Sequence, residues 1–235
     1  MTYKRIFVSE NAECGVVDNI SKLAEEVVFL KSNPVLPRPV SAHADMQMLY
    51  IVDTLILTRD LYNSICEHLP SGINIMFAES NHTSVYPGDV NLNAMYIGGY
   101  LIANESALDP AVKKLCEEKG ITILNVKQGY AKCSSLQVGD NALITADSGI
   151  AKAAMQNGID TLLISSGSIV LDGYDYGFIG GASFYNPNDR TVYFFGDLHT
   201  HPDYTKIIDF CEKHNVNVNS CNYGALTDIG GAVSI

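Results

Sequence analysis

The segment Tyr96-Ile-Gly-Gly-Tyr-Leu-Ile-Ala103 places two short apolar stretches on either side of a Gly-Gly pair, the pattern of a β-hairpin. Asp109-Pro110 follows as a helix-start signal, because Asp caps free backbone N–H groups and Pro suits the first helical turn. Cys116-Glu-Glu-Lys-Gly-Ile-Thr-Ile-Leu124 then ends an amphipathic helix and begins another apolar strand. Together these segments predict a ββαβ unit.

Other parts of the chain follow the same order, two of them closely and one loosely. Their markers are Asn141-Ala-Leu-Ile-Thr145 with Asp147-Ser148 and Met155–Ile164, then Thr191-Val-Tyr-Phe-Phe195 with His201-Pro202 and Cys211–Val218, and, most loosely, Leu49-Tyr-Ile-Val52 with Leu55-Ile-Leu57 and Cys66–Ile75. A period of roughly 40 to 55 residues predicts a repeat architecture. The fold class expected is therefore α/β, built from ββαβ repeats.

The two ends of the chain supply half-units. We predict a strand over residues 4–9, a helix over residues 18–31 and a terminal strand over residues 230–235, while the Pro-rich residues 33–39 form an extended connection. The terminal strand would complete the unit begun by residues 4–9 and close a ring, which removes exposed sheet edges. An ordinary α/β sandwich is the alternative. Either arrangement is expected to be one domain over residues 1–235.

The composition indicates a compact globular protein. Of the 235 residues, 47% are hydrophobic and 17% are charged, which suits a single domain with a large core. No apolar run reaches the roughly 18 to 20 residues that span a bilayer, and no signal peptide is recognisable. We therefore expect a cytoplasmic location, no membrane partner and no cofactor, and we make no prediction of the oligomeric state.

The charge and the cysteines narrow the classes of ligand. A net charge of −11 argues against nucleic acid, which needs a basic face, and is compatible with a small cationic molecule. The six cysteines contain no CxxC pair, so zinc is unsupported. Cys66, Cys116 and Cys211 share one repeat position near the end of a helix, which favours a small buried side chain.

Residues 120–235 resemble the dimethylarginine hydrolases, which belong to the pentein, or guanidino-group-modifying, superfamily. The resemblance lies in Lys132-Cys133-Ser134-Ser135 with Gly139–Ile144, in Thr191–Phe195 with Tyr204–Ile208, and in Gly224-Ala-Leu-Thr-Asp228. It implies a five-bladed α/β propeller, closed by the N- and C-terminal strands. It also implies a ligand site in the central channel.

The departures from this family weaken the functional analogy. The family's nucleophilic Cys corresponds to Asp228 here, and Cys221 lies seven residues earlier. The family's His precedes the segment of Cys133, where this chain has Val126-Lys-Gln-Gly-Tyr130 without His. A thiolate is an effective nucleophile only where it is placed and activated. The chain is therefore expected to form a branch without the usual amidino-transferring pair.

The segment Ser41-Ala-His43-Ala-Asp45-Met-Gln47 is the strongest polar cluster, and it begins the first full repeat. If it is extended, His43, Asp45 and Gln47 share one face at a period of two. A carboxylate there would suit a guanidinium or ammonium group, and a histidine titrates near neutral pH. A strand-start cluster bonded to loop backbone is the alternative.

Asp228 is the third candidate catalytic residue, with His43 and Asp45. Facing Asp45 across a channel, it would form a cation site or acquire a raised pKa; otherwise it is a turn residue that caps backbone amides. Gln47, Asn93, Cys133 and Asp172 are candidate ligand-binding residues. For Cys133, a small buried thiol is the alternative.

Asp197-Leu-His199-Thr-His201-Pro202-Asp203 contains residue types that bind metals. However, it falls where the other repeats start a helix, so helix capping is the favoured interpretation. A metal site at His199 and His201 is kept as the weaker one.

The sequence leaves three functions open. The first is an enzyme or binding protein for a small guanidino-like cation, held by Asp45, Asp228 and Asp172. The second is a non-enzymatic propeller used for protein interaction, and the third is a metal-dependent hydrolase. The sequence does not decide whether the chain is an enzyme, nor whether Cys133 or Cys221 replaces the missing nucleophile.

Overall fold

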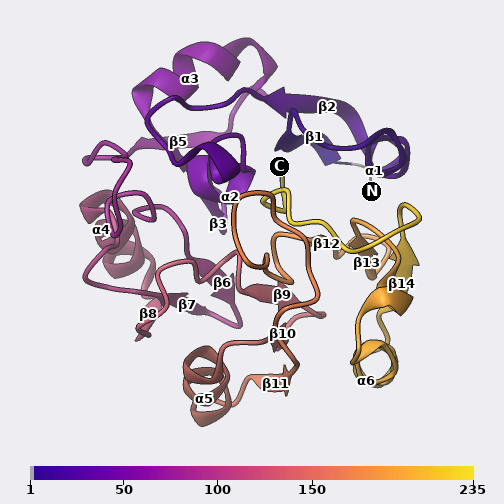
Figure 1. Ribbon diagram of the computed structural model, residues 1–235. Coiled ribbons are helices and arrows are strands. Elements are labelled where there is room, and N and C mark those ends of the chain that lie inside the picture. Colours follow the sequence, from indigo (N-terminus) through magenta and orange to yellow (C-terminus); the bar gives the residue numbers. More distant parts are fainter. Residues whose placement is uncertain (1–2) are drawn as a thin grey trace.

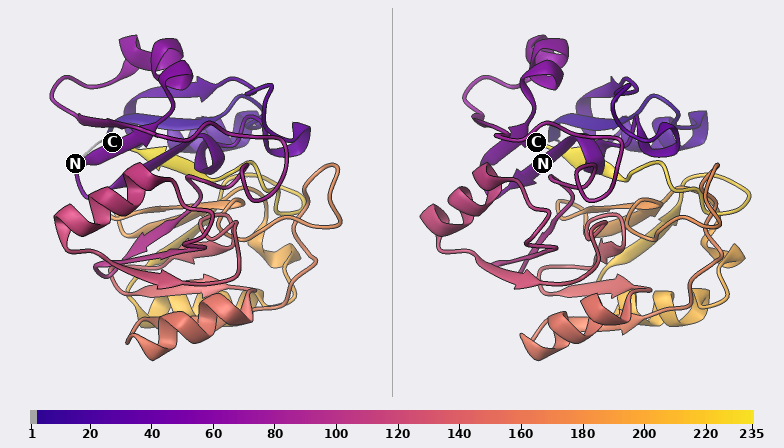
Figure 2. Two further views of the ribbon diagram at one scale, coloured as in Figure 1. Left: turned by 90° about the vertical axis from the view of Figure 1, so that its left-hand side faces the viewer. Right: turned by 60° about the vertical axis from the view of Figure 1, so that its left-hand side comes forward.

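The computed structural model describes residues 3–235, and their strands form five three-stranded sheets. In Figure 1 the sheets surround a common centre, with the longer helices on the outside. Figure 2, turned from that view, again shows helices outermost and strands between them. The mixed α/β class predicted from the sequence is confirmed.

Four of these sheets share one internal topology: the first strand pairs antiparallel with the second, and the second pairs parallel with the third after a helix. Their elements are β3 (Met48–Ile51), β4 (Thr54–Leu57), α3 (Arg59–Ile65) and β5 (Asn74–Phe77); β6 (Met95–Ile97), β7 (Tyr100–Ala103), α4 (Pro110–Lys119) and β8 (Thr122–Asn125); β9 (Ser135–Gln137), β10 (Ala142–Thr145), α5 (Ser148–Gln156) and β11 (Asp160–Leu163); and β12 (Ser183–Asn186), β13 (Thr191–Phe194), α6 (Tyr204–Lys213) and β14 (Asn217–Ser220). The first strand of each sheet lies nearest the centre in Figure 1.

Local signals set the bounds of the helices. The Asp109 carboxylate accepts a hydrogen bond from the Ala111 N–H at 2.8 Å and caps α4, which ends at Gly120 in the left-handed conformation. The Asp147 carboxylate caps α5 in the same way, through the Ile150 N–H at 2.8 Å. These two helix starts are therefore as predicted, whereas α6 begins without a side-chain cap.

The fifth sheet corrects one prediction. It contains β15 (Ala232–Ser234), β1 (Tyr3–Ser9) and β2 (Ala24–Leu30), with α1 (Cys14–Ile20) between β1 and β2. The prediction of one helix over residues 18–31 is wrong, because residues 24–30 pair parallel with β1. Their β-branched and aromatic side chains favour a strand once a partner strand is present. β15 pairs antiparallel with β1, so the first and last strands lie in one sheet.

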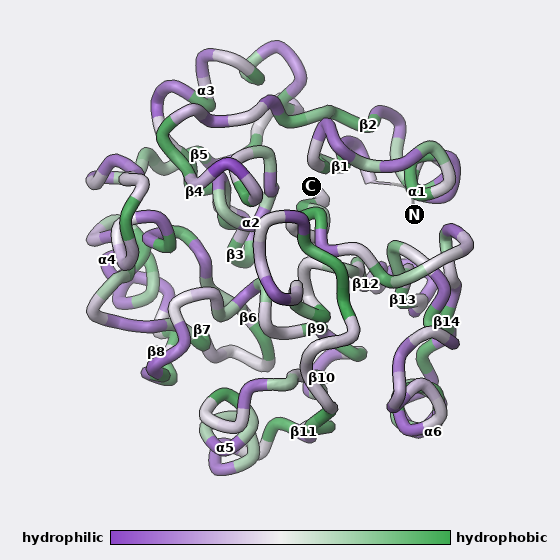
Figure 3. The backbone as a smooth tube through the Cα atoms, viewed as in Figure 1, coloured by the Kyte–Doolittle hydropathy of each residue, from purple (hydrophilic) through white to green (hydrophobic). Residues whose placement is uncertain are grey.

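The core lies between each sheet and its neighbours. One cluster joins β9 and β10 to β13 and α6, and another joins β1 and α1 to β12 and the C-terminal segment. Figure 3 shows hydrophobic residues on β3 and β9 and mixed hydropathy along α4 and α6. Neighbouring sheets therefore share apolar contacts, and these fix the residues at the centre of the molecule.

All six cysteines are free thiols. Cys116 and Cys211 are buried, whereas Cys66 lies exposed in the short helix η2 (Cys66–His68). The prediction of a shared buried position therefore fails for Cys66. In residues 3–235, no helix has the length and apolar character needed to cross a bilayer.

Candidate functional site

His43 and Asp45 lie in a helical turn after the Pro-rich connection. The chain forms η1 (Arg38–Val40) and then α2 (Ala44–Gln47), with His43 at the N-cap position. The Asp45 N–H donates to the Gly230 carbonyl oxygen at 3.2 Å, which ties this turn to the C-terminal segment. The His43 and Asp45 side chains are both buried.

The condition under which His43, Asp45 and Gln47 would share one face is not met, because residues 44–47 form α2 and are not extended. The Gln47 Nε2 donates to the carbonyl oxygens of Lys31 and Ser41, both at 3.0 Å. Gln47 lines a separate cavity and holds the loop before α2. It does not join the two aspartates.

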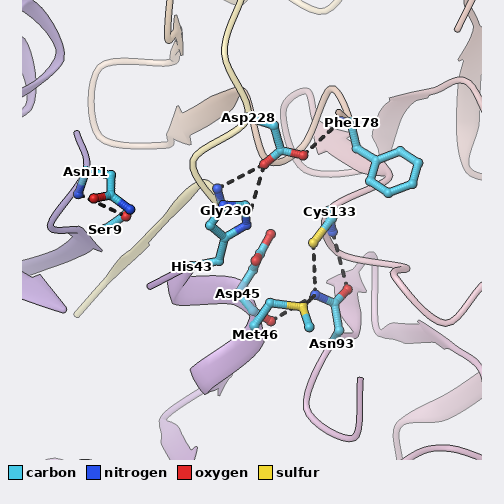
Figure 4. Close-up of polar contacts among 10 residues, drawn as sticks. All are labelled: Ser9, Asn11, His43, Asp45, Met46, Asn93, Cys133, Phe178, Asp228 and Gly230. Carbon is cyan, nitrogen blue, oxygen red and sulfur yellow. Dashed lines mark hydrogen bonds and ion pairs between the residues drawn. The ribbon is translucent and has the colours of Figure 1, made fainter. Parts of the chain in front are cut away.

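Asp45 carries a buried carboxylate without partners. It is 2% exposed, yet neither of its oxygens has a hydrogen-bond partner within residues 3–235. Figure 4 shows this carboxylate among His43, Asp228 and Cys133. An ionised carboxylate buried in this way costs several kcal/mol of stability. A ligand that supplies positive charge and N–H donors would remove that cost.

Asp228 faces this group from the segment that precedes β15. Its carboxylate accepts hydrogen bonds from the Phe178 N–H at 2.8 Å and from the Gly230 N–H at 3.0 Å. Burial, followed by the charge of Asp45, raises the pKa of Asp228 to about 7. The site can therefore gain or lose a proton on Asp228 near neutral pH.

His43 approaches Asp228 without a close hydrogen bond. Its Nδ1 lies 3.7 Å from the Asp228 Oδ1, and no partner for this nitrogen is found in the described chain. Burial lowers the pKa of His43, and the charge of Asp45 opposes that effect. The neutral imidazole is therefore favoured at neutral pH.

Asn93 fixes the relative positions of three sheets at the site. Its Nδ2 donates to the Asp45 carbonyl oxygen and to the Cys133 Sγ, both at 3.0 Å. Its Oδ1 accepts from the Lys132 N–H at 2.8 Å. Asn93 thus acts as a bridge between α2 and the start of β9.

Cys133 is enclosed by the same group of residues. Burial, then the charges of Asp45 and Asp228 and the approach of the thiol to the Asp45 carboxyl group, raise the pKa of the Cys133 thiol well above its ordinary value. The thiol form is therefore strongly favoured. Without a bound cation, this environment opposes formation of a thiolate nucleophile.

Glycines make room for the two titratable side chains that face each other. A Cβ at Gly181 would collide with the Asp228 carboxyl group, and a Cβ at Gly177 would collide with the Asp228 Cβ. Gly230, at φ +81°, lies against the His43 side chain. Larger residues at these positions would displace His43 or Asp228.

Cavities meet on both sides of this cluster. His43 and Asp228 line a cavity of about 230 Å³ together with Cys133, and they also line a wider one of about 620 Å³. Asp45 lines a third cavity, of about 310 Å³, with Lys132. The two aspartates therefore border different cavities, Asp45 the third one and Asp228 the first two.

The remaining sequence candidates lie outside the buried cluster. Asp172 is exposed and lines the wider cavity, which His43 and Asp228 also line. Cys221 is packed in the apolar cluster around β1, where burial raises the pKa of its thiol to about 12. Of the two cysteines considered as replacements for the nucleophile, only Cys133 lies at the cavity.

His199 lies within the short helix η3 (Leu198–Thr200), and His201 is its C-cap residue. The exposed His199 ring bonds to the Asp197 carboxylate at 2.9 Å, whereas the buried His201 Nδ1 accepts from the Asp203 N–H at 3.0 Å. No group of three or more His, Cys, Asp or Glu residues is positioned to hold a metal in the described part of the chain.

Comparison with protein-family models identifies the family of this chain. The model described as "Family of unknown function (DUF6873)" matches residues 7–233. The chain belongs to this family. A search of the curated proteins finds no match.

Solved structures show which fold this DUF6873 chain has. Dimethylarginine dimethylaminohydrolase from Pseudomonas aeruginosa, a Cys-to-Ser variant complexed with citrulline, is similar with a TM-score of 0.60 and 13% identity over 100% of both chains. Inosamine-phosphate amidinotransferase from Streptomyces griseus gives a TM-score of 0.54 and 12% identity, covering 98% of this chain and 91% of that one. Both enzymes are pentein superfamily members, so the predicted resemblance is confirmed. At these identities it shows the fold alone.

The sequence analysis missed the aromatic side of the site in this DUF6873 protein. Tyr130, Tyr174, Tyr176 and Phe178 line the cavity of about 230 Å³ opposite the polar group. The run Tyr174-Asp-Tyr-Gly-Phe178 was a usable signal, because it places three aromatic residues at alternate positions outside any helix or strand.

Proposed function

We propose that this protein binds a small cationic, guanidino-like molecule at Asp45, Asp228 and His43. The site would lie in the centre of a single five-bladed propeller domain spanning residues 1–235, with the pairing of β1 and β15 closing the ring. The observation that carries the proposal is the Asp45 carboxylate, which is buried and has two oxygens without partners.

A planar cation matches what Asp45 lacks. Two parallel N–H groups of a guanidinium can donate to both oxygens of one carboxylate. Asp228 supplies a second negative charge, and its backbone hydrogen bonds hold it in place. A net charge of −11 adds a favourable long-range potential for a cation.

Binding is expected to be linked to release of a proton. Without ligand, Asp228 has a pKa of about 7, because burial and Asp45 disfavour its charged form. A bound cation favours the carboxylate and lowers that pKa. Affinity should therefore rise with pH until Asp228 is fully ionised in the free protein.

Any turnover at this site would use acid–base chemistry in preference to attack by a thiolate. A carboxyl group that titrates near pH 7 is suited to proton transfer, and Asp228 has that property. Cys133 is held as a thiol by its surroundings. A bound cation would weaken the repulsion between the two aspartates and a Cys133 thiolate. Formation of that thiolate would therefore depend on the bound ligand.

The ligands of the structural neighbours are compatible with this proposal. Two dimethylarginine dimethylaminohydrolase structures contain citrulline and an adduct of S-methyl-L-thiocitrulline, respectively. These ligands belong to those enzymes, and they support only the choice of probes for this chain.

A thermal-shift titration tests the proposal with arginine, agmatine, methylated arginines, creatine and polyamines. Ligand that binds only the folded state raises the melting temperature as its concentration rises. We expect a saturable increase that Asp45→Asn weakens by at least about 100-fold in apparent affinity, as expected for a buried ion pair of a few kcal/mol. Asp140→Asn is the matched control, because the Asp140 side chain is 91% exposed.

Two outcomes would contradict the proposal. One is the absence of a shift across the whole panel, which would favour the protein-interaction alternative. The other is a shift that Asp45→Asn and Asp140→Asn leave equally unchanged, because the cation would then bind elsewhere on the acidic surface.

A further inference from the structure

One wall of the cavity of about 230 Å³ is aromatic. Tyr130, Tyr174, Tyr176 and Phe178 line it, facing the polar side formed by His43, Cys133 and Asp228. A cavity with carboxylates on one side and several π-faces on the other attracts a cation by two separate interactions.

The inner part of this wall is held in place by its own contacts. The Tyr130 hydroxyl donates to the buried Asp89 carboxylate at 2.6 Å, and the Tyr130 ring stacks on Phe178 with centroids 6.2 Å apart and planes 29° apart. The Tyr176 ring meets Phe178 edge-on, at 6.2 Å and 88°. These rings therefore form a corner and not a single flat surface.

The outer part is exposed without ligand. Tyr174 is 46% exposed and Tyr176 is 41% exposed, which is unusual for rings that border a cavity. Both lie in the loop of residues 171–176, which closes at its base through the Gly177 N–H and the Ile169 carbonyl oxygen at 2.8 Å. A ligand seated against these rings would bury apolar surface that is now in contact with water.

The same loop is attached to the segment that carries Asp228. The Asp228 N–H donates to the Val170 carbonyl oxygen at 2.8 Å, and Val170 forms a parallel bridge with Thr227. The aromatic wall and the Asp228 carboxylate are therefore fixed relative to one another. A ligand that fits one must also fit the other.

We infer that the site selects an N-alkylated ammonium ion, with an N–H group for Asp228 and alkyl groups for the aromatic corner. This inference rests on the proposed function and narrows its ligand class. A planar guanidinium presents only two faces, whereas a tetrahedral alkylated nitrogen presents carbons in several directions, as rings set at 88° require. The small cavity favours a compact ion.

Isothermal titration calorimetry with ethanolamine and N,N-dimethylethanolamine tests this inference. Both are cations at about pH 7.5, and they differ only in two methyl groups. We expect the dimethyl compound to bind wild type about tenfold more tightly, from cation–π and apolar contacts. The double variant Tyr174→Leu/Tyr176→Leu should remove this preference, so that the two amines bind it with affinities within about twofold of each other. Tyr223→Leu is the control, because Tyr223 is 96% exposed and outside the cavity.

The outcomes separate this inference from the proposed function. Equal affinity for the two amines, or a preference that survives in the double variant, overturns the inference while cation binding lost in Asp45→Asn still supports the proposed function. Binding of neither amine nor any guanidino compound by wild type overturns both. A preference lost in the double variant and kept in Tyr223→Leu supports the inference.

Discussion

Two His- and Asp-rich regions of this molecule differ in whether their buried carboxylates all have hydrogen-bond partners. In the region of residues 197–203, Asp203 accepts from the Ser165 N–H at 2.7 Å and from the Lys206 Nζ at 2.6 Å. In the region of His43, Asp45 and Asp228, the Asp45 oxygens and the His43 Nδ1 have no partner in residues 3–235. The first region resembles a metal motif in sequence, yet its carboxylates are used within the fold.

This difference separates a structural cluster from a candidate site. Hydrogen bonds and Lys206 lower the pKa of Asp203, whereas burial and Asp45 raise that of Asp228. Folding therefore stabilises the ionised form of one aspartate and disfavours that of the other. Burial of unpartnered polar groups lowers the stability of the ligand-free protein, and a ligand that pairs with them can raise that stability.

The largest expected effect concerns the pH dependence of stability. Folded Asp228 keeps its proton up to about pH 7, whereas an unfolded Asp releases it near pH 4. Its contribution to the free energy of unfolding is therefore complete below about pH 4 and is lost as pH rises towards 7. We expect wild type to lose about 4 kcal/mol relative to Asp228→Asn across that range, by urea unfolding at several pH values.

Asp203→Asn provides the opposite comparison in the same measurement. The pKa of folded Asp203 is lowered, so its contribution is present above about pH 4 and is lost on acidification. Wild type should therefore gain stability relative to this variant as pH rises from the acidic side. Parallel curves for wild type and Asp228→Asn would show that Asp228 titrates normally and would contradict the contrast between the two regions.

Local sequence signals predicted the parts of the fold that depend on neighbouring residues. Asp109, Asp147 and Gly120 act through backbone groups within a few positions, so the bounds of α4 and the start of α5 could be predicted. Residues 24–30 could not, because their strand depends on pairing with β1, which lies earlier in the chain. Long-range pairing decided between two locally acceptable structures.

The candidate site, like the fold, was predicted only in part. His43, Asp45, Asn93, Cys133 and Asp228 come together, although the extended segment used to group the first two is a helical turn. Gln47 carries the same kind of polar atom but bonds to loop carbonyls, and Asp172 borders the wider cavity as an exposed residue outside the buried cluster. Whether a carboxylate is left without a partner depends on side chains from distant segments, and no local pattern contains that information.

A smaller effect, opposite in sign for the two regions, is expected at neutral pH. Asp45→Asn replaces a buried carboxyl group whose oxygens have no hydrogen-bond partner, so the ligand-free protein should become more stable by about 1 to 2 kcal/mol. Asp203→Asn weakens a charge-assisted hydrogen bond and an ion pair, so the protein should become less stable by about 1 to 2 kcal/mol. Chemical denaturation of both variants measures the difference. Destabilisation by Asp45→Asn would mean that the Asp45 carboxylate has an internal partner.

The smallest effect is expected at His199, and it addresses the metal alternative. The His199 side chain is 69% exposed and bonds only to the nearby Asp197 carboxylate, so His199→Ala should change the free energy of unfolding by less than about 0.5 kcal/mol. Added zinc should raise the melting temperatures of wild type and His199→Ala equally or not at all. A saturable zinc-dependent increase lost in His199→Ala would identify a metal site.

His201→Ala should lower the free energy of unfolding by more, about 1 kcal/mol, whether or not zinc is present, because the buried Asp203 N–H loses its acceptor. A stability loss without a zinc response would thus assign this region to the fold, in contrast to the unpartnered carboxylate of Asp45.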